Sequence, residues 1–87
     1  MFKIKDTTGE TIIQFSERGE WEFSINKDGY IELLTQKDLD QGKVDGGTPI
    51  KKYATQARAI EVIQEAMQTI LNAQHNKGRK FYILPAE

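Results

Sequence analysis

The sequence contains no cysteine, and this absence removes several kinds of chemistry at once. Disulfide bonds, thiolate nucleophiles and the usual structural zinc sites all require cysteine side chains. The stability of the fold must therefore come from packing, and we expect no bound metal ion.

Residues that carry out catalysis are equally scarce. His75 is the only histidine, near the end of a helical pattern, where a charged side chain suits the helix dipole. The Gly-x-Ser-x-Gly spacing of a nucleophile elbow does not occur. Glu61 and Glu65 lie on one side of the same pattern, where carboxylates are usually solvated surface charges. We therefore expect a protein that is not an enzyme, without catalytic residues or a cofactor.

Long apolar runs are also absent. No run approaches the roughly 18 residues of a membrane-spanning helix, and residues 1 to 5 alternate where a signal peptide would be continuously apolar. The composition is 38% hydrophobic and 29% charged, with a net charge of −1, as in ordinary globular domains. We expect one domain, 1–87, located in the cytoplasm, with no membrane contact and with nucleic acid disfavoured as a partner.

Three short turn motifs punctuate the first third of the chain at intervals of ten residues. Each begins with a side chain that can cap a turn and ends in glycine: Asp6-Thr7-Thr8-Gly9, Ser16-Glu17-Arg18-Gly19 and Asn26-Lys27-Asp28-Gly29. Such tetrapeptides suit a type I turn followed by glycine in the left-handed conformation. The spacing predicts short strands joined by hairpins.

The apolar residues around these turns predict the register of the hairpins. At the third turn a three-residue loop, 27–29, places Ile25 opposite Ile31 and so keeps the apolar side chains on one face. The same rule at the second turn predicts two pairs: Phe15 with Trp21, and Ile13 with Phe23. At the first turn a four-residue loop, 6–9, is favoured because it brings Phe2 and Ile4 onto the shared face.

The segment from Thr55 to His75 has the periodicity of one long amphipathic helix. Its central apolar stripe consists of Ile60, Ile63, Met67, Ile70 and Leu71. Thr55 is the predicted N-cap, and Gly78 is suited to the left-handed position after the last turn. The run from Phe81 to Leu84 is apolar on both sides and predicts a buried strand that ends at Pro85.

Together these patterns predict an α+β domain. We expect a mainly antiparallel meander sheet of four or five strands, with one long helix packed across one face, in the order β-β-β-β-α-β.

A shoulder of smaller residues runs beside the predicted helical stripe: Ala59, Val62, Ala66 and Ala73. Because small side chains let another element approach closely, this shoulder is a candidate partner surface. Self-association through it, or through an exposed sheet edge, would make the protein a homodimer.

Basic residues form two small clusters that flank the predicted helix: Lys51 and Lys52 before it, and Lys77, Arg79 and Lys80 after it. With Tyr53, Phe81 and Tyr82 nearby, they are a candidate basic patch for single-stranded nucleic acid. The alternative, which we favour, is that turns are charged and that the aromatic residues belong to the core.

Two stretches invite a calcium interpretation. The segment from Ser24 to Ile31 resembles the start of an EF-hand loop, but Thr35 occupies the position of the bidentate glutamate, so a hairpin turn is favoured. The polar segment 36–49 carries Asp38, Asp40 and Asp45 without a suitably placed glutamate. An exposed acidic loop is the better interpretation, although loops of this length are often functional.

The segment from Tyr53 to Ala66 and the terminal Phe81-Tyr82-Ile83-Leu84-Pro85 resemble a group of small proteins from Gram-positive bacteria and their prophages. In that group a Tyr-x-Thr helix start, an Arg-Ala-x-x-Val core and a short aromatic strand ending in proline recur. The resemblance covers about the last third of the chain and implies a phage or mobile-element setting with an accessory role.

Three functions are consistent with these residues. The leading hypothesis is a non-enzymatic accessory or protein-interaction module, which self-association would make a homodimer. A small nucleic-acid-binding module is the alternative, and it requires the two basic clusters to converge on one face. A small-molecule or metal-binding domain comes third, and it requires the segment 36–49 to close over a pocket.

Overall fold

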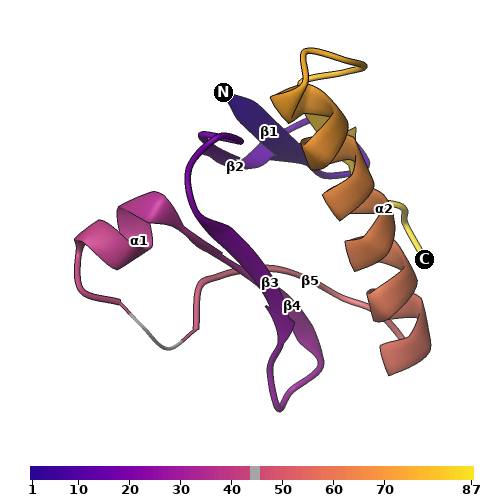
Figure 1. Ribbon diagram of the computed structural model, residues 1–87. Coiled ribbons are helices and arrows are strands. Elements are labelled where there is room, and N and C mark those ends of the chain that lie inside the picture. Colours follow the sequence, from indigo (N-terminus) through magenta and orange to yellow (C-terminus); the bar gives the residue numbers. More distant parts are fainter. Residues whose placement is uncertain (44–45) are drawn as a thin grey trace.

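A computed structural model describes residues 1–43 and 46–87. The elements follow one another as β1 (Phe2–Lys5), β2 (Thr11–Phe15), β3 (Trp21–Ile25), β4 (Tyr30–Thr35), α1 (Gln36–Asp40), β5 (Thr48–Lys52), α2 (Gln56–Gln74) and β6 (Phe81–Ile83). They form two three-stranded sheets, β2-β1-β6 and β3-β4-β5. Strand β6 runs parallel to β1, and the other pairs are antiparallel. Helix α2 lies beside both sheets (Figure 1).

The predicted α+β class and the long helix are confirmed, but the prediction of a single sheet of four or five strands is wrong. The chain divides at the second turn, because β2 pairs with β1 and β3 pairs with β4. The predicted pairs of Phe15 with Trp21 and Ile13 with Phe23 do not form. Gly9 and Gly29 have φ angles of +90° and +88°, whereas Gly19 does not take a positive φ, so the bulged loop is missing there.

The third hairpin has the predicted register, with Ile25 opposite Ile31. The Asn26 side-chain oxygen Oδ1 accepts hydrogen bonds from the backbone N–H groups of Asp28, at 2.9 Å, and Tyr30, at 3.0 Å. The residues that resemble a calcium loop therefore form a capped hairpin turn.

The first hairpin places Phe2 and Ile4 on the predicted apolar face, but with a different loop. Its loop has three residues rather than four, because the backbone N–H of Asp6 donates to the carbonyl oxygen of Glu10 at 2.9 Å. A bulge then shifts the register between Ile4 and Lys5 and places Phe2 opposite Phe15. The extra residue at the bulge turns Phe2 and Ile4 to the apolar face, which the predicted four-residue loop would also have done.

Helix α2 begins and ends close to the predicted positions. The backbone N–H of Arg58 donates to Thr55 Oγ1 at 3.1 Å, which caps the first turn. After the last turn Asn76 takes the left-handed conformation, with φ of +56°, and Gly78, the residue predicted for this conformation, also takes it, with φ of +71°. The N–H of Lys77 donates to the carbonyl oxygen of Asn72 at 2.8 Å, which completes a Schellman motif.

The described part of the segment 36–49, residues 36–43 and 46–49, is more structured than an exposed loop. Asp38 Oδ2 accepts hydrogen bonds from the backbone N–H of Thr35, at 2.8 Å, and from its hydroxyl, at 3.1 Å. This contact caps the short helix α1, and β5 follows from Thr48. Asp45 lies outside the described residues.

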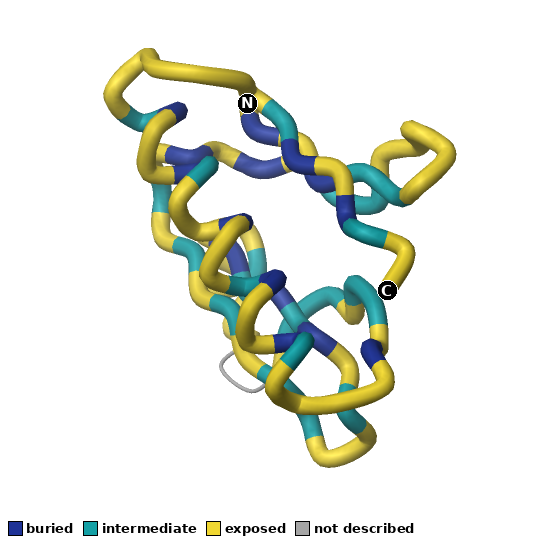
Figure 2. The backbone as a smooth tube through the Cα atoms, turned by 90° about the vertical axis from the view of Figure 1, so that its right-hand side faces the viewer, coloured by how far each residue is buried: buried dark blue, intermediate teal, exposed yellow. Residues whose placement is uncertain are grey.

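The core lies between α2 and the two sheets. Its largest fully buried side chains are Phe2, Ile4, Ile31, Leu33, Val62 and Ile70. In Figure 2 the buried positions recur along α2 turn by turn. Strand β6 is not buried on both sides as predicted, because Tyr82 and Leu84 are buried while Ile83 remains 44% exposed.

The left-handed residue after α2 gives a test of the fold. Because glycine adopts positive φ without steric cost, Asn76→Gly should raise the free energy of unfolding by roughly 0.5 to 1 kcal/mol, and Asn76→Ala should lower it by a similar amount. Both variants lose the exposed 3.4 Å contact from Arg18, so their difference isolates the backbone effect. Urea unfolding measures both, and equal stabilities would contradict the assignment.

Candidate functional site

The shoulder predicted as a partner surface lies in the core. The exposed fractions of Ala59, Val62, Ala66 and Ala73 are 1%, 1%, 2% and 0%. Small side chains here let α2 lie close to the sheets, so the close approach they permit is used inside the molecule. These four residues are not available to a partner.

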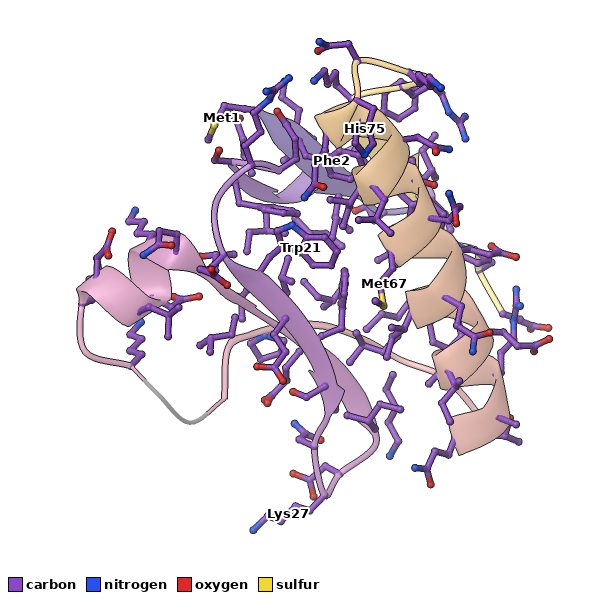
Figure 3. The ribbon with its side chains drawn as sticks, in the orientation of Figure 1. Met1, Phe2, Trp21, Lys27, Met67 and His75 are labelled. Atoms are coloured by element: carbon purple, nitrogen blue, oxygen red, sulfur yellow. The ribbon has the colours of Figure 1, made fainter. Side chains whose placement is uncertain are left out.

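The exposed apolar side of α2 lies elsewhere. Ile60, Met67 and Leu71 are 43%, 38% and 40% exposed, and Ile63 is half-buried. Their spacing places all four on one stripe of the helix, adjoining the buried stripe. Figure 3 shows Met67 and Trp21 in the space between α2 and β3. The apolar surface of the helix therefore continues from the core toward solvent.

Strand β3 borders the same space. Trp21, Phe23 and Ile25 are each half-buried and pack against the core. They pair with Thr35, Leu33 and Ile31 of β4, and thus share the face that α2 covers. We call the combined set the β3–α2 surface: Trp21, Phe23, Ile25, Ile60, Ile63, Met67 and Leu71.

The outer edge of β3 is free along its backbone. The strand lies at one end of the sheet β3-β4-β5. The N–H of Asn26 donates to Tyr30 at 2.9 Å, and hydrogen-bonded pairs alternate along antiparallel strands. Ser24 and Glu22 therefore direct their backbone groups toward β4. The backbone groups of Trp21, Phe23 and Ile25 point away from β4, where the described part of the chain offers no partner strand.

The turn before β3 is anchored by Glu17, which sequence patterns did not single out. Its carbonyl oxygen accepts hydrogen bonds from Gln74 Nε2, at 2.6 Å, and from Trp21 Nε1, at 3.2 Å. Its carboxylate is 7% exposed and lies 3.5 Å from Lys80 Nζ, which also donates to Ala73 O at 3.0 Å. This turn is thereby tied to the end of α2 and to the residue before β6.

The two predicted basic clusters do not converge. Lys51 and Lys52 precede α2, whereas Lys77, Arg79 and Lys80 follow it, and a helix of 19 residues separates them by about 28 Å. Lys80 is engaged by Glu17 as described above. The five residues therefore do not form one patch.

The second cluster instead meets two basic residues of β1. Lys3 and Lys5 pair with Phe81 and Ile83 of β6, on the outer face of the sheet β2-β1-β6. The Nζ atom of Lys5 lies 4.9 Å from the centroid of the Phe81 ring, and Cζ of Arg79 lies 5.1 Å from it. Sequence reasoning missed this arrangement because it depends on the parallel pairing of the two chain ends.

Residues from the described part of the segment 36–49 line an open cavity of about 500 Å³ beside β2. Its wall carries charges of both signs, including Lys37, Asp38 and Asp40. Asp38 already accepts two hydrogen bonds from Thr35, and Asp40 accepts one from Gln36 at 2.9 Å. Within 1–43 and 46–87 no cluster of three metal-ligating side chains occurs. The cavity therefore lacks a set of converging polar groups that would define a ligand.

Two buried hydroxyl groups fasten the C-terminal segment to α2 and to the residue after β5. Tyr53 donates to the carbonyl oxygen of Pro85 at 2.7 Å, and Tyr82 donates to Glu65 Oε2 at 2.9 Å. Burial raises the pKa of both phenols, and the hydrogen bond to Glu65 raises the pKa of Tyr82 further. Both hydroxyls are accounted for by structural contacts.

No protein-family model, no curated protein and no solved structure matches the chain. No helix in the described ranges combines the length and apolar character needed to cross a membrane.

The raised pKa of Tyr82 predicts a loss of stability at alkaline pH. Below the usual value of 10.0 the phenol is protonated in both the folded and the unfolded state. Above it the unfolded chain releases the proton while the folded chain keeps it, so the free energy of unfolding falls as the pH rises. Tyr82→Phe should cost about 1 kcal/mol at pH 7 through the lost hydrogen bond, yet lose less stability above pH 10.

Urea unfolding at neutral pH and at two alkaline pH values measures this effect. Tyr30→Phe is the control, because Tyr30 is 41% exposed. An alkaline loss that is equally steep in Tyr82→Phe and in the wild type would contradict the assignment.

Proposed function

We propose that this protein is a non-enzymatic interaction module that binds another polypeptide at the β3–α2 surface. One observation carries the proposal: an exposed apolar stripe on α2 runs beside a strand whose outer backbone groups are free. Contiguous exposed apolar residues next to an unpaired strand edge are typical of sites that accept a further strand.

The two parts of this surface supply different contributions to binding. The free N–H and C=O groups of β3 would give affinity through main-chain hydrogen bonds, which are independent of the partner's sequence. Side chains such as Met67 and Leu71 would give selectivity for apolar residues on one side of the incoming strand. Methionine suits this role because its flexible thioether adapts to different shapes.

Charged substitutions on α2 test the proposal. The double variant Met67→Glu with Leu71→Glu should fold with a free energy of unfolding within about 1 kcal/mol of the wild type, because both side chains are partly exposed. It should lose the proteins, further copies of this chain included, that the tagged wild type retains. Quantitative mass spectrometry of copurified proteins from the native host measures this loss.

The matched control places the same two charges elsewhere on α2. Gln68→Glu with Asn72→Glu alters exposed residues about 100° around the helix from the stripe. This control should retain the wild-type partners. Identical sets of bound proteins for the wild type and for the Met67 and Leu71 variant would contradict the proposal.

A second candidate function rests on the outer face of the sheet β2-β1-β6. There the cations of Lys5 and Arg79 both lie close to the Phe81 ring, with Lys3 on the same face. Aromatic rings flanked by cations offer stacking and phosphate contacts to single-stranded nucleic acid. The overall charge of −1 weighs against this candidate, so it ranks second.

Titration with a single-stranded oligonucleotide at two salt concentrations tests this second candidate. Binding should weaken with salt, and Lys5→Gln with Arg79→Gln should reduce both the affinity and the salt slope, the slope by up to about 1.4 for two lost phosphate contacts. Lys51→Gln with Lys52→Gln removes the same charge from the other end of α2 and should have little effect. Absent or salt-independent binding would exclude this function.

The resemblance of the last third of the chain to small proteins of Gram-positive bacteria and their prophages supports an accessory role in a phage or mobile element. An interaction module of this size fits such a role, because it needs no cofactor to act.

A further inference from the structure

We infer that the polypeptide bound at the β3–α2 surface is a second copy of this chain, joined through β3 about a two-fold axis at Phe23. The inference rests on the proposed function and goes beyond it by naming the partner and the register. It follows from three features of β3: which backbone groups are free, which side chains would meet, and where the charges fall.

The free backbone groups of β3 match those of a second β3. Trp21, Phe23 and Ile25 direct their N–H and C=O groups away from β4, because Glu22 and Ser24 alternate with them in the ladder. In an antiparallel pair of β3 strands centred on Phe23, this residue bonds to its own copy. Trp21 bonds to Ile25 of the other copy, so every free group along the edge gains a partner.

The side chains are complementary in the same register. On the face that α2 covers, Phe23 meets Phe23 and Trp21 meets Ile25, which are favourable aromatic and aliphatic cross-strand pairs. On the opposite face Glu22 meets Ser24 of the other copy. No like charges stand directly opposite each other, as they would if the axis lay at Glu22.

Two of the other three edge strands, β5 and β6, are less suited to this pairing. Strand β5 carries Pro49, which has no N–H to donate at the opposite edge of the same sheet. Strand β6 has only three residues. Strand β3 has five residues, contains no proline, and has apolar residues of α2 on one side. A two-fold axis through β3 brings both α2 stripes to the same face of the joined six-stranded sheet.

Single cysteines test the register, because the chain contains no cysteine of its own. Phe23→Cys places two thiols across the axis, where paired residues have Cα atoms about 5.5 Å apart, within disulfide range. Ser24→Cys is the matched control, since its copies are offset by two residues and lie roughly 8 Å apart, beyond that range. Mild oxidation should cross-link the first variant into a dimer and leave the second monomeric.

Sedimentation equilibrium of the wild type accompanies the cross-linking, so the test does not depend on the folding of Phe23→Cys. The wild type should associate reversibly to twice the monomer mass, and Met67→Glu with Leu71→Glu should weaken this dimer at least tenfold. A wild type that stays monomeric at millimolar concentration overturns the second copy as partner. Cross-linking of Ser24→Cys instead of Phe23→Cys overturns the register.

These outcomes separate the dimer from the broader proposal. If the wild type is monomeric but its copurified proteins still depend on Met67 and Leu71, the β3–α2 surface binds another protein and only the dimer is wrong. If neither measurement responds to these substitutions, both the dimer and the proposed function are wrong.

Discussion

The architecture depends on how Glu17 is held in the turn between β2 and β3. Its carbonyl oxygen accepts hydrogen bonds from Gln74 and Trp21, and its carboxylate lies beside Lys80. A buried carboxylate is costly unless cations lie close to it, and Lys80 Nζ and the amino group of Met1, 3.5 and 3.7 Å from its oxygens, help to hold this turn near the end of α2. The turn itself is closed by the N–H of Gly19, which donates to the carbonyl oxygen of Ser16 at 3.1 Å, but β2 and β3 do not pair beyond it.

The division into two sheets follows from this anchor, and so does the free edge. Strand β2 remains with β1, which carries β6 on its other side, and β3 remains with β4. Had β2 and β3 paired, the backbone groups of Phe23 would be satisfied within the chain. Instead they border an apolar stripe of α2 that includes Met67, which is 38% exposed. The turn that holds Glu17 thus separates the two sheets and leaves the β3 edge that is proposed for binding.

Local signals in the sequence predicted what is locally determined. Asn26 and Thr55 cap their own turns, so the third hairpin and the start of α2 are visible in short windows. The prediction of a hairpin at the second turn was wrong because the residues that hold this turn, Gln74 and Lys80, lie 57 and 63 residues further along the chain. The prediction of which side of α2 faces the core was wrong for a similar reason. Its apolar arc spans both the alanine shoulder and the stripe with Met67, and only tertiary packing selects between them.

Amide hydrogen exchange in dilute, monomeric solution tests the central claim most directly. If Glu17 separates β3 from β2, the N–H groups of Glu22 and Ser24, bonded to β4, should exchange slowly. Those of Trp21, Phe23 and Ile25 should exchange at least tenfold faster, because they face solvent. Slow exchange at all five positions would show that β3 is paired on both sides, which would contradict the free edge and the account built on it.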